Sequence, residues 1–120
     1  MLKRLFKRFS QDLGEQRAET IRSWAGKQAG VVAIDDVRPR EVARVCGVVE
    51  LLRVRPREGR ESFEAVVSDG TGTVTAVWLG RSALSGLSIG TRIFLNGRFG
   101  GERGSLHVMN PEFEFAPGER

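Results

Sequence analysis

The segment Asp69-Gly70-Thr71-Gly72 constrains the fold most, because it separates two stretches in which apolar and polar residues alternate. Glycines at these positions permit the positive φ angles of a tight hairpin turn. If Gly70 and Thr71 form the turn, Asp69 pairs with Gly72, and six apolar side chains share one face: Phe63, Ala65, Val67, Val74, Ala76 and Trp78. Burying them contributes on the order of 10 kcal/mol before entropy, so this face is predicted to be the core. The other face is predicted to lie outside: Ser62, Glu64, Val66, Ser68, Thr73, Thr75, Val77 and Leu79.

The rest of the β-patterned region adds three more strands around this hairpin. The five predicted strands cover about 42–54, 62–68, 73–79, 92–99 and 105–109, and Ala83, Leu84 and Leu87 favour a short helix within 80–90. Gly47 and Gly97 lie in the two strands that must curl most in a small closed barrel. This order of elements predicts an all-β fold, a five-stranded OB-fold Greek-key barrel over residues 42–115.

An amphipathic helical extension is predicted for residues 1–28, followed by a connection at 29–41, with a tail at 116–120 after the barrel. Apolar side chains lie on one arc of the helix and basic or polar ones on the opposite arc: Leu2, Leu5, Phe6, Phe9 and Leu13 against Lys3, Arg4, Lys7, Arg8 and Gln11. Gly14 predicts two short helices or one kinked helix, ending near Gly26 or Gly30. The stripe could cover an open end of the barrel, serve as a basic arm for nucleic acid, or make weak membrane contact through residues 2–13.

Charge is distributed unevenly along the chain of 120 residues, whose net charge is +4. Residues 1–30 carry seven basic and three acidic groups, whereas residues 31–120 carry 12 Arg and 12 acidic residues. The excess favours an acidic partner, yet the net charge of the barrel does not supply the attraction.

Several function classes are disfavoured by composition. No run of about 18 apolar residues predicts a membrane span, and no apolar segment with a cleavage site follows the basic N-terminus, so we expect a cytoplasmic protein. Cys46 is the sole cysteine, and we expect it to be a small buried residue. His107 has no cluster of ligands at metal-binding spacing, and no nucleophile motif accompanies it. We therefore expect no metal, no cofactor, no small-molecule substrate and no catalytic residues.

Several stretches resemble the tRNA-anti type of OB-fold nucleic-acid-binding domain, which includes the RecG wedge domain and anticodon-binding domains of class II aminoacyl-tRNA synthetases. The resemblance rests on residues 66–75 (VVSDGTGTVT), 77–81 (VWLGR), the Ile89-Gly90 turn, 95–98 (LNGR) and the terminal 109–115 (MNPEFEF). The chain looks most like a stand-alone actinobacterial OB-fold protein of about this length.

That resemblance implies that nucleic acid lies across the outer face of strands 62–68 and 73–79, between the loops after the first and fourth strands. Synthetase relatives place a stacking aromatic and a Gln at the positions matching Glu64 and Thr75. Neither residue here can stack on a base, so anticodon recognition of that kind is not expected.

Two arginine-bearing loops are the candidate nucleic-acid-binding site, because guanidinium groups bond phosphate and stack on bases. The first follows strand 42–54, where alternation would give Arg53, Arg55 and Arg57 a shared face. The second flanks the turn after strand 92–99, where Phe99 either stacks on a base or closes the barrel. The candidate residues are Arg53, Arg55, Arg57, Arg60, Arg98, Phe99 and Arg103.

Two functions follow. The first is a non-catalytic module that binds single-stranded or structured DNA or RNA with low sequence specificity. The alternative is a protein-interaction or membrane-peripheral adaptor that keeps the OB scaffold without binding nucleic acid, which the neutral barrel and Glu64 favour.

Overall fold

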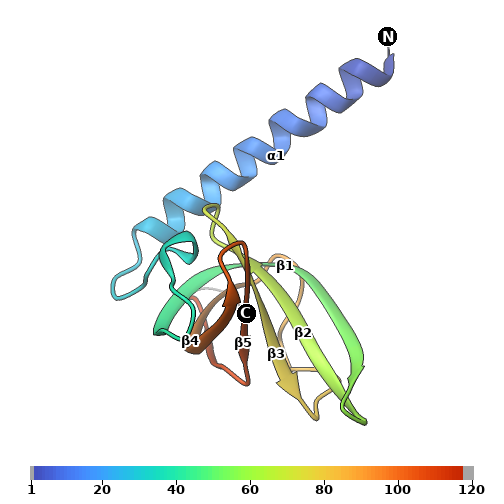
Figure 1. Cartoon of the computed structure of the whole chain (residues 1–120). Coiled ribbons are helices and arrows are strands. Elements are labelled where there is room, and N and C mark those ends of the chain that lie inside the picture. The colour runs from blue at the N-terminus through green and yellow to red at the C-terminus, as the bar shows by residue number, and fades with distance from the viewer. Residues whose placement is uncertain (1, 118–120) are drawn as a thin grey trace.

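The computed structural model describes the backbone of residues 2–117 and the side chains of residues 11–117. Within the described residues, one α-helix precedes six strands, and Figure 1 shows the helix beside the curved sheet. In chain order the elements are α1 (Leu2–Gly26), a 3-10 turn η1 (Ile34–Asp36), β1 (Val42–Arg57), β2 (Arg60–Ser68), β3 (Thr73–Leu79), β4 (Arg92–Glu102), β5 (Ser105–Met109) and β6 (Glu112–Phe115).

The strands close into a ring. Neighbours follow the order β1-β2-β3-β5-β4, and an additional pairing of β1 with β4 completes the circle. The β3–β5 pairing is parallel, and the other pairings are antiparallel. This five-stranded ring is an OB-fold barrel, and it confirms the predicted fold class. A sixth strand, β6, which the sequence did not predict, pairs with β4 and places Phe113 against Trp78, 5.6 Å between ring centroids.

The core forms around the predicted hairpin. Phe63 pairs with Trp78 and Val67 with Val74, which confirms the register, and all six predicted core side chains are at least 93% buried. The prediction for the opposite face was wrong at four positions, because Ser62, Glu64, Ser68 and Val77 are also buried. On this side the Glu64 carboxylate accepts a hydrogen bond from Arg53 Nε, and the Ser62 hydroxyl donates to the Arg55 carbonyl, both on β1.

Close packing explains the two glycines in the most curved strands. A Cβ at Gly47 would lie 2.5 Å from the Ser68 carbonyl oxygen, and one at Gly97 would lie 2.7 Å from Val108 Cγ2. Gly47 is where β1 passes from β4 toward β2, because Val48 pairs with both Arg92 and Ser68. The barrel therefore closes tightly only where a side chain is missing.

The segment between β3 and β4 contains turns and no helix, contrary to the prediction. Gly80, Gly86 and Gly90 all have positive φ angles, and the backbone bond from Leu87 N to the Leu84 carbonyl closes a single turn. Three glycines in the left-handed region within eleven residues prevent the consecutive right-handed φ/ψ values that a helix needs. Leu84 and Leu87 still pack on the core.

Helix α1 ends at Gly26, as predicted, but it runs without a break through Gly14, so the alternative of two short helices was wrong. A single glycine costs a helix only about 1 kcal/mol, which does not force a break. The last turns pack on the barrel, where Ala25 and Cys46 are buried together and Trp24 meets Phe94 at 6.4 Å. Figure 1 shows the helix leading away from the barrel toward its N-terminus. Among the described residues, no helix is both long enough and apolar enough to span a membrane.

The predicted apolar stripe of α1 lies mostly outside the described side chains. Leu2, Leu5, Phe6 and Phe9 belong to residues 1–10, whereas Leu13 is described and is 40% exposed.

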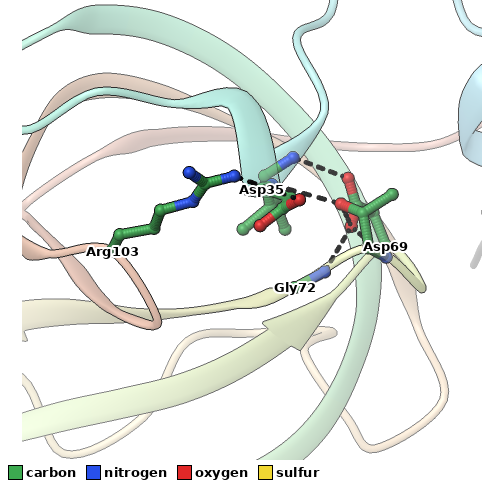
Figure 2. A network of polar contacts seen from close by, with 6 residues as sticks. Asp35, Asp69, Gly72 and Arg103 are labelled. Carbon is green, nitrogen blue, oxygen red and sulfur yellow. Dashed lines mark hydrogen bonds and ion pairs between the residues drawn. The ribbon is translucent and has the colours of Figure 1, made fainter.

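Asp69 ties the connection to the β2–β3 turn (Figure 2). One carboxylate oxygen accepts hydrogen bonds from Thr71 N, Thr71 Oγ1 and Gly72 N, and the other accepts from Ile34 N at 2.8 Å. The carboxylate is 97% buried, so these donors replace its lost hydration. The turn thereby fixes η1 beside it.

Candidate nucleic-acid interface

The β1–β2 hairpin is longer than the sequence predicted, and it places the first arginine group on strands rather than in a loop. Its turn consists of Glu58 and Gly59, both with positive φ angles (51° and 77°), as a two-residue hairpin of this kind requires. Arg57 pairs with Arg60 and Pro56 with Glu61, two residue pairs beyond Ser62, whose β3 partner is the last residue of that strand. The tip thus projects past β3, at the lower right of Figure 1.

Charges are sorted between the two faces of this hairpin. Residues opposite each other in an antiparallel pair share a face, and alternate residues return to it. Arg53, Arg55 and Arg57 therefore share one face, and Arg60 joins them through its pairing with Arg57. Glu61 lies on the opposite face, because it pairs with Pro56. The shared face predicted for these arginines is confirmed.

Arg53 is neutralised within this face. Its Nε donates to Glu64 Oε1 at 2.8 Å, and the Glu64 side chain is only 3% exposed, against 37% for Arg53. The two residues are cross-strand partners in the β1–β2 ladder. A buried carboxylate requires such a partner, so Arg53 is held by Glu64 and has less capacity for an external phosphate.

The remaining arginines of the hairpin are turned to solvent. Arg57 reaches across β2 and β3, where its Nη1 lies 3.6 Å from Met109 Sδ on β5. Arg55 and Arg60 are exposed, and within residues 11–117 no carboxylate lies within 4 Å of either guanidinium group. We call Arg55, Arg57 and Arg60 the hairpin arginines.

The second predicted group does not join the first. Arg98 lies on the β1–β4 side of the barrel, where its Nη1 donates to the Arg40 carbonyl at 2.7 Å. Arg103 lies in the β4–β5 turn, where its Nη2 is 3.6 Å from Asp35 Oδ2 in an exposed pair (Figure 2). Because β5 starts beside the start of β3, this turn and the hairpin tip lie at opposite ends of β3.

Phe99 is not available for stacking, contrary to its candidate role. It is completely buried, paired with Val108 in the core. The reason is parity: Ile93, Leu95, Gly97 and Phe99 are alternate residues of β4 and all face inward. That signal was present in the sequence.

An exposed strip on the outer face of β1, β3 and β5 lies between the tip of the β1–β2 hairpin and the β4–β5 turn. Most of its residues were not predicted as a site from the sequence. Leu51 and Met109 are 43% and 38% exposed, Thr75 is half-buried, and His107 is exposed as the parallel partner of Thr75. We call Leu51, Thr75, His107 and Met109 the floor. Only the parallel pairing of β3 with β5 brings the last three together, and residues more than thirty positions apart in sequence gave no local sign of it.

The chemistry of this surface is that of an anion-binding strip. It offers guanidinium donors at one end, an imidazole and a hydroxyl in the middle, and apolar contact from Leu51 and Met109. Within the described residues, no three His, Cys, Asp or Glu side chains gather as metal ligands. Cys46 lies elsewhere, and burial, reinforced by the Asp69 carboxylate and opposed by Arg44, raises the pKa of its thiol to about 11.

Two solved structures share this fold. One is RecG bound to a three-way DNA junction, with a TM-score of 0.58 and 22% identity over 70% of this chain; the match spans 12% of that chain. The other is the replication factor A-related protein from Methanobacterium thermoautotrophicum, with a TM-score of 0.56 and 20% identity, covering 75% of this chain and 94% of that one. No protein-family model and no curated protein matches the sequence. At these identities the likeness establishes the OB-fold.

Proposed function

We propose that this protein is a non-catalytic cytoplasmic module that binds single-stranded or structured nucleic acid with low sequence specificity, as an OB-fold of the tRNA-anti type. The observation that carries the proposal is the sorting of charge on the β1–β2 hairpin, with the hairpin arginines together on one exposed face. The structural likeness to RecG, whose structure holds a DNA junction, supports it.

The phosphate chain would run from the hairpin arginines along the floor. Guanidinium groups that hold phosphates do not read bases, and within the floor the imidazole of His107 is the one ring on which a base could stack, a contact that any base can make. Arg103 at the far end would add a contact, since an ion pair as exposed as that with Asp35 is weak and opens readily. Low sequence specificity follows from this arrangement.

Fluorescence anisotropy of labelled single-stranded DNA, RNA and tRNA tests the proposal with the full-length protein at low and physiological salt. The double variant Arg55→Glu/Arg57→Glu should weaken binding at least about tenfold, because two phosphate contacts become repulsive. Its matched control is Arg22→Glu/Arg38→Glu, which changes the net charge equally at exposed positions away from the hairpin.

Absence of binding by the unmodified protein at low salt would refute the proposed function. An equal loss of affinity in the hairpin variant and the control would mean that binding depends on net charge alone and that the hairpin is not its site.

A further inference from the structure

The junction between α1 and the barrel carries a second feature that the proposed function does not use. Two adjoining hollows, of about 610 and 380 Å³, run along the helix where it meets the start of β4. They share Gln16, Thr20 and Arg92, so they form one groove between helix and barrel, which we call the helix groove.

Apolar side chains line the bottom of the helix groove. Leu13, Ile21 and Val48 line one hollow, and Trp24 lines the other. Leu13 is 40% exposed, and Ile21, Val48 and Trp24 are half-buried. Next to the groove, Ile89 precedes the lining residue Gly90 and is 65% exposed. These side chains give an incoming partner a line of apolar contact along the helix.

The rim of the helix groove is basic. Arg17 and Lys27 stand at its two ends, and Arg92 lies between them, with its guanidinium 4.9 Å from the centre of the Trp24 ring. Among the described residues that line the groove, Glu19 is the one carboxylate. An occupant with acidic groups flanking an apolar strip would match both the apolar lining and the basic rim of the helix groove.

We propose that the helix groove is a docking site for an acidic amphipathic helix of a partner protein. Such a helix presents apolar side chains at i, i+3, i+4 and i+7, which suit a groove with an apolar lining, and its flanking carboxylates would meet Arg17 and Lys27. Docking there would also support α1, whose described side chains between residues 11 and 20 are otherwise mostly exposed.

Three other occupants fit less well. Nucleic acid gains little from Leu13, Ile21 and Val48, because aliphatic side chains do not stack on bases, and the Trp24 ring already contacts Phe94 and the Arg92 guanidinium. A membrane surface suits a convex face rather than a groove. A second copy of α1 would bring the same basic excess, since residues 1–30 carry seven basic and three acidic groups.

Titration of the ¹⁵N-labelled full-length protein tests this proposal by NMR. The probe is a synthetic helical peptide with Leu at the i, i+3, i+4 and i+7 positions and Glu at the others, and its comparison peptide carries Lys in place of Glu. The acidic peptide should cause saturable shifts at the amides of Leu13, Arg17, Ile21 and Gly90, and the basic peptide should leave them unchanged.

Matched variants locate the binding. Leu13→Gln and Arg17→Gln should each raise the dissociation constant at least about fivefold. Arg22→Gln, which removes an equal charge from the same helix outside the groove, and Val42→Gln, at an apolar position 65% exposed on β1, should leave it unchanged.

No saturable shift, or equal shifts with both peptides, would overturn the proposal. So would shifts of the same amides by phosphatidylserine vesicles or single-stranded DNA while the acidic peptide is silent. Because none of these variants touches the hairpin arginines, failure here leaves the anisotropy test of nucleic-acid binding independent.

Discussion

Glu64 shows how a single side chain changes the character of a surface at the residue scale. It lies in the middle of β2, on the face where the fold would present its ligand surface, and it is almost completely buried. Arg53, its cross-strand partner, donates a hydrogen bond from Nε to the Glu64 carboxylate. The pair therefore stiffens the base of the hairpin and lowers the positive charge available to a ligand.

Replacing Glu64 with Gln should strengthen nucleic-acid binding. The amide keeps an acceptor for Arg53 but removes the opposing charge, so affinity for single-stranded DNA should rise about fivefold, the order expected for one added phosphate contact. Stability should fall by about 1–2 kcal/mol, because a hydrogen bond between two ions becomes one in which only the donor is charged. Anisotropy and urea unfolding measure the two effects.

The control for this substitution is Glu50→Gln, which removes one negative charge at an exposed position of β1 and leaves the Arg53–Glu64 pair intact. An equal gain in affinity from both variants would show that net charge, and not release of Arg53, is responsible.

The raised pKa of the Cys46 thiol predicts that the folded protein loses stability at alkaline pH. Burial raises the pKa of its thiol from 9.0 to about 11, so the folded protein holds the proton more tightly than the unfolded chain. This contribution is complete below pH 9 and is lost as the pH rises through the folded pKa near 11. Stability should thus fall by up to about 3 kcal/mol across this range.

Urea unfolding as a function of pH, compared between the unmodified protein and Cys46→Ala, isolates the thiol from the lysines that titrate nearby in pH. The difference in unfolding free energy between the two proteins should shrink above pH 9; a constant difference would show that the thiol does not ionise in this range.

The attachment of α1 depends, at the scale of elements, on the β2–β3 turn. Gly70 has a φ of 85°, and a Cβ there would lie 2.3 Å from the Ala18 carbonyl oxygen on the helix. The same turn holds η1 through Asp69 and Ile34. One turn therefore positions both the helix and the connection that joins it to the barrel.

Gly70→Ala should loosen the helix from the turn. The added methyl group combines positive-φ strain with a clash against backbone, and we expect a loss of about 2–4 kcal/mol. Gly59→Ala is the matched control, because Gly59 has a similar φ of 77° and open space around it, so its cost should be only about 1 kcal/mol.

Urea unfolding measures both losses, and fluorescence of Trp24 reports whether the helix end has moved from Phe94. Equal losses in the two variants would mean that the contact between Gly70 and Ala18 adds nothing to the intrinsic strain.

The elements that could be predicted from the sequence are those set by local pattern. The β2–β3 register followed from one glycine turn and strict alternation, and the same parity applied to β4 would have placed Phe99 in the core. Trp78 was expected in the core and is 94% buried.

What could not be predicted depends on contacts between distant segments. The Arg53–Glu64 pair follows from the Glu58-Gly59 turn, whose register runs unbroken from Arg57–Arg60 to Leu51–Val66, but it was missed because the predicted strand ended near residue 54. The floor requires the parallel pairing of Thr75 with His107. The helix groove requires the angle at which α1 meets β4, which Trp24 and Phe94 set by packing.

The whole molecule separates its charges between its parts. Residues 31–120 carry equal numbers of acidic and basic groups, and the net charge of +4 resides in the first 30 residues. Attraction of a polyanion to the barrel must therefore come from the local arrangement of the hairpin arginines, and we expect its dependence on salt to reflect their number.

Removing two of these arginines should change the salt dependence by a definite amount. In the variant Arg55→Gln/Arg57→Gln, the slope of log affinity for single-stranded DNA against log salt should become less negative by about 1.4, since each phosphate contact on a single strand contributes about 0.7. Anisotropy titrations between about 50 and 200 mM salt measure the slope. An unchanged slope would mean that neither residue contacts phosphate.

The closure of the ring between β1 and β4 has a consequence for synthesis of the chain. Val42 pairs with Arg98, so the first half of β1 has no strand partner until β4 has been synthesised. The β6 strand, which pairs with β4, is synthesised later still. Such long-range pairing implies folding in milliseconds to seconds, while α1, whose bonds are local, forms far sooner. During that interval β1, β2 and β3 have open edges that invite aggregation. The arginines and Pro56 at the far end of β1 are the residue types that discourage such pairing, and we expect them to protect the nascent sheet as well as to face the ligand.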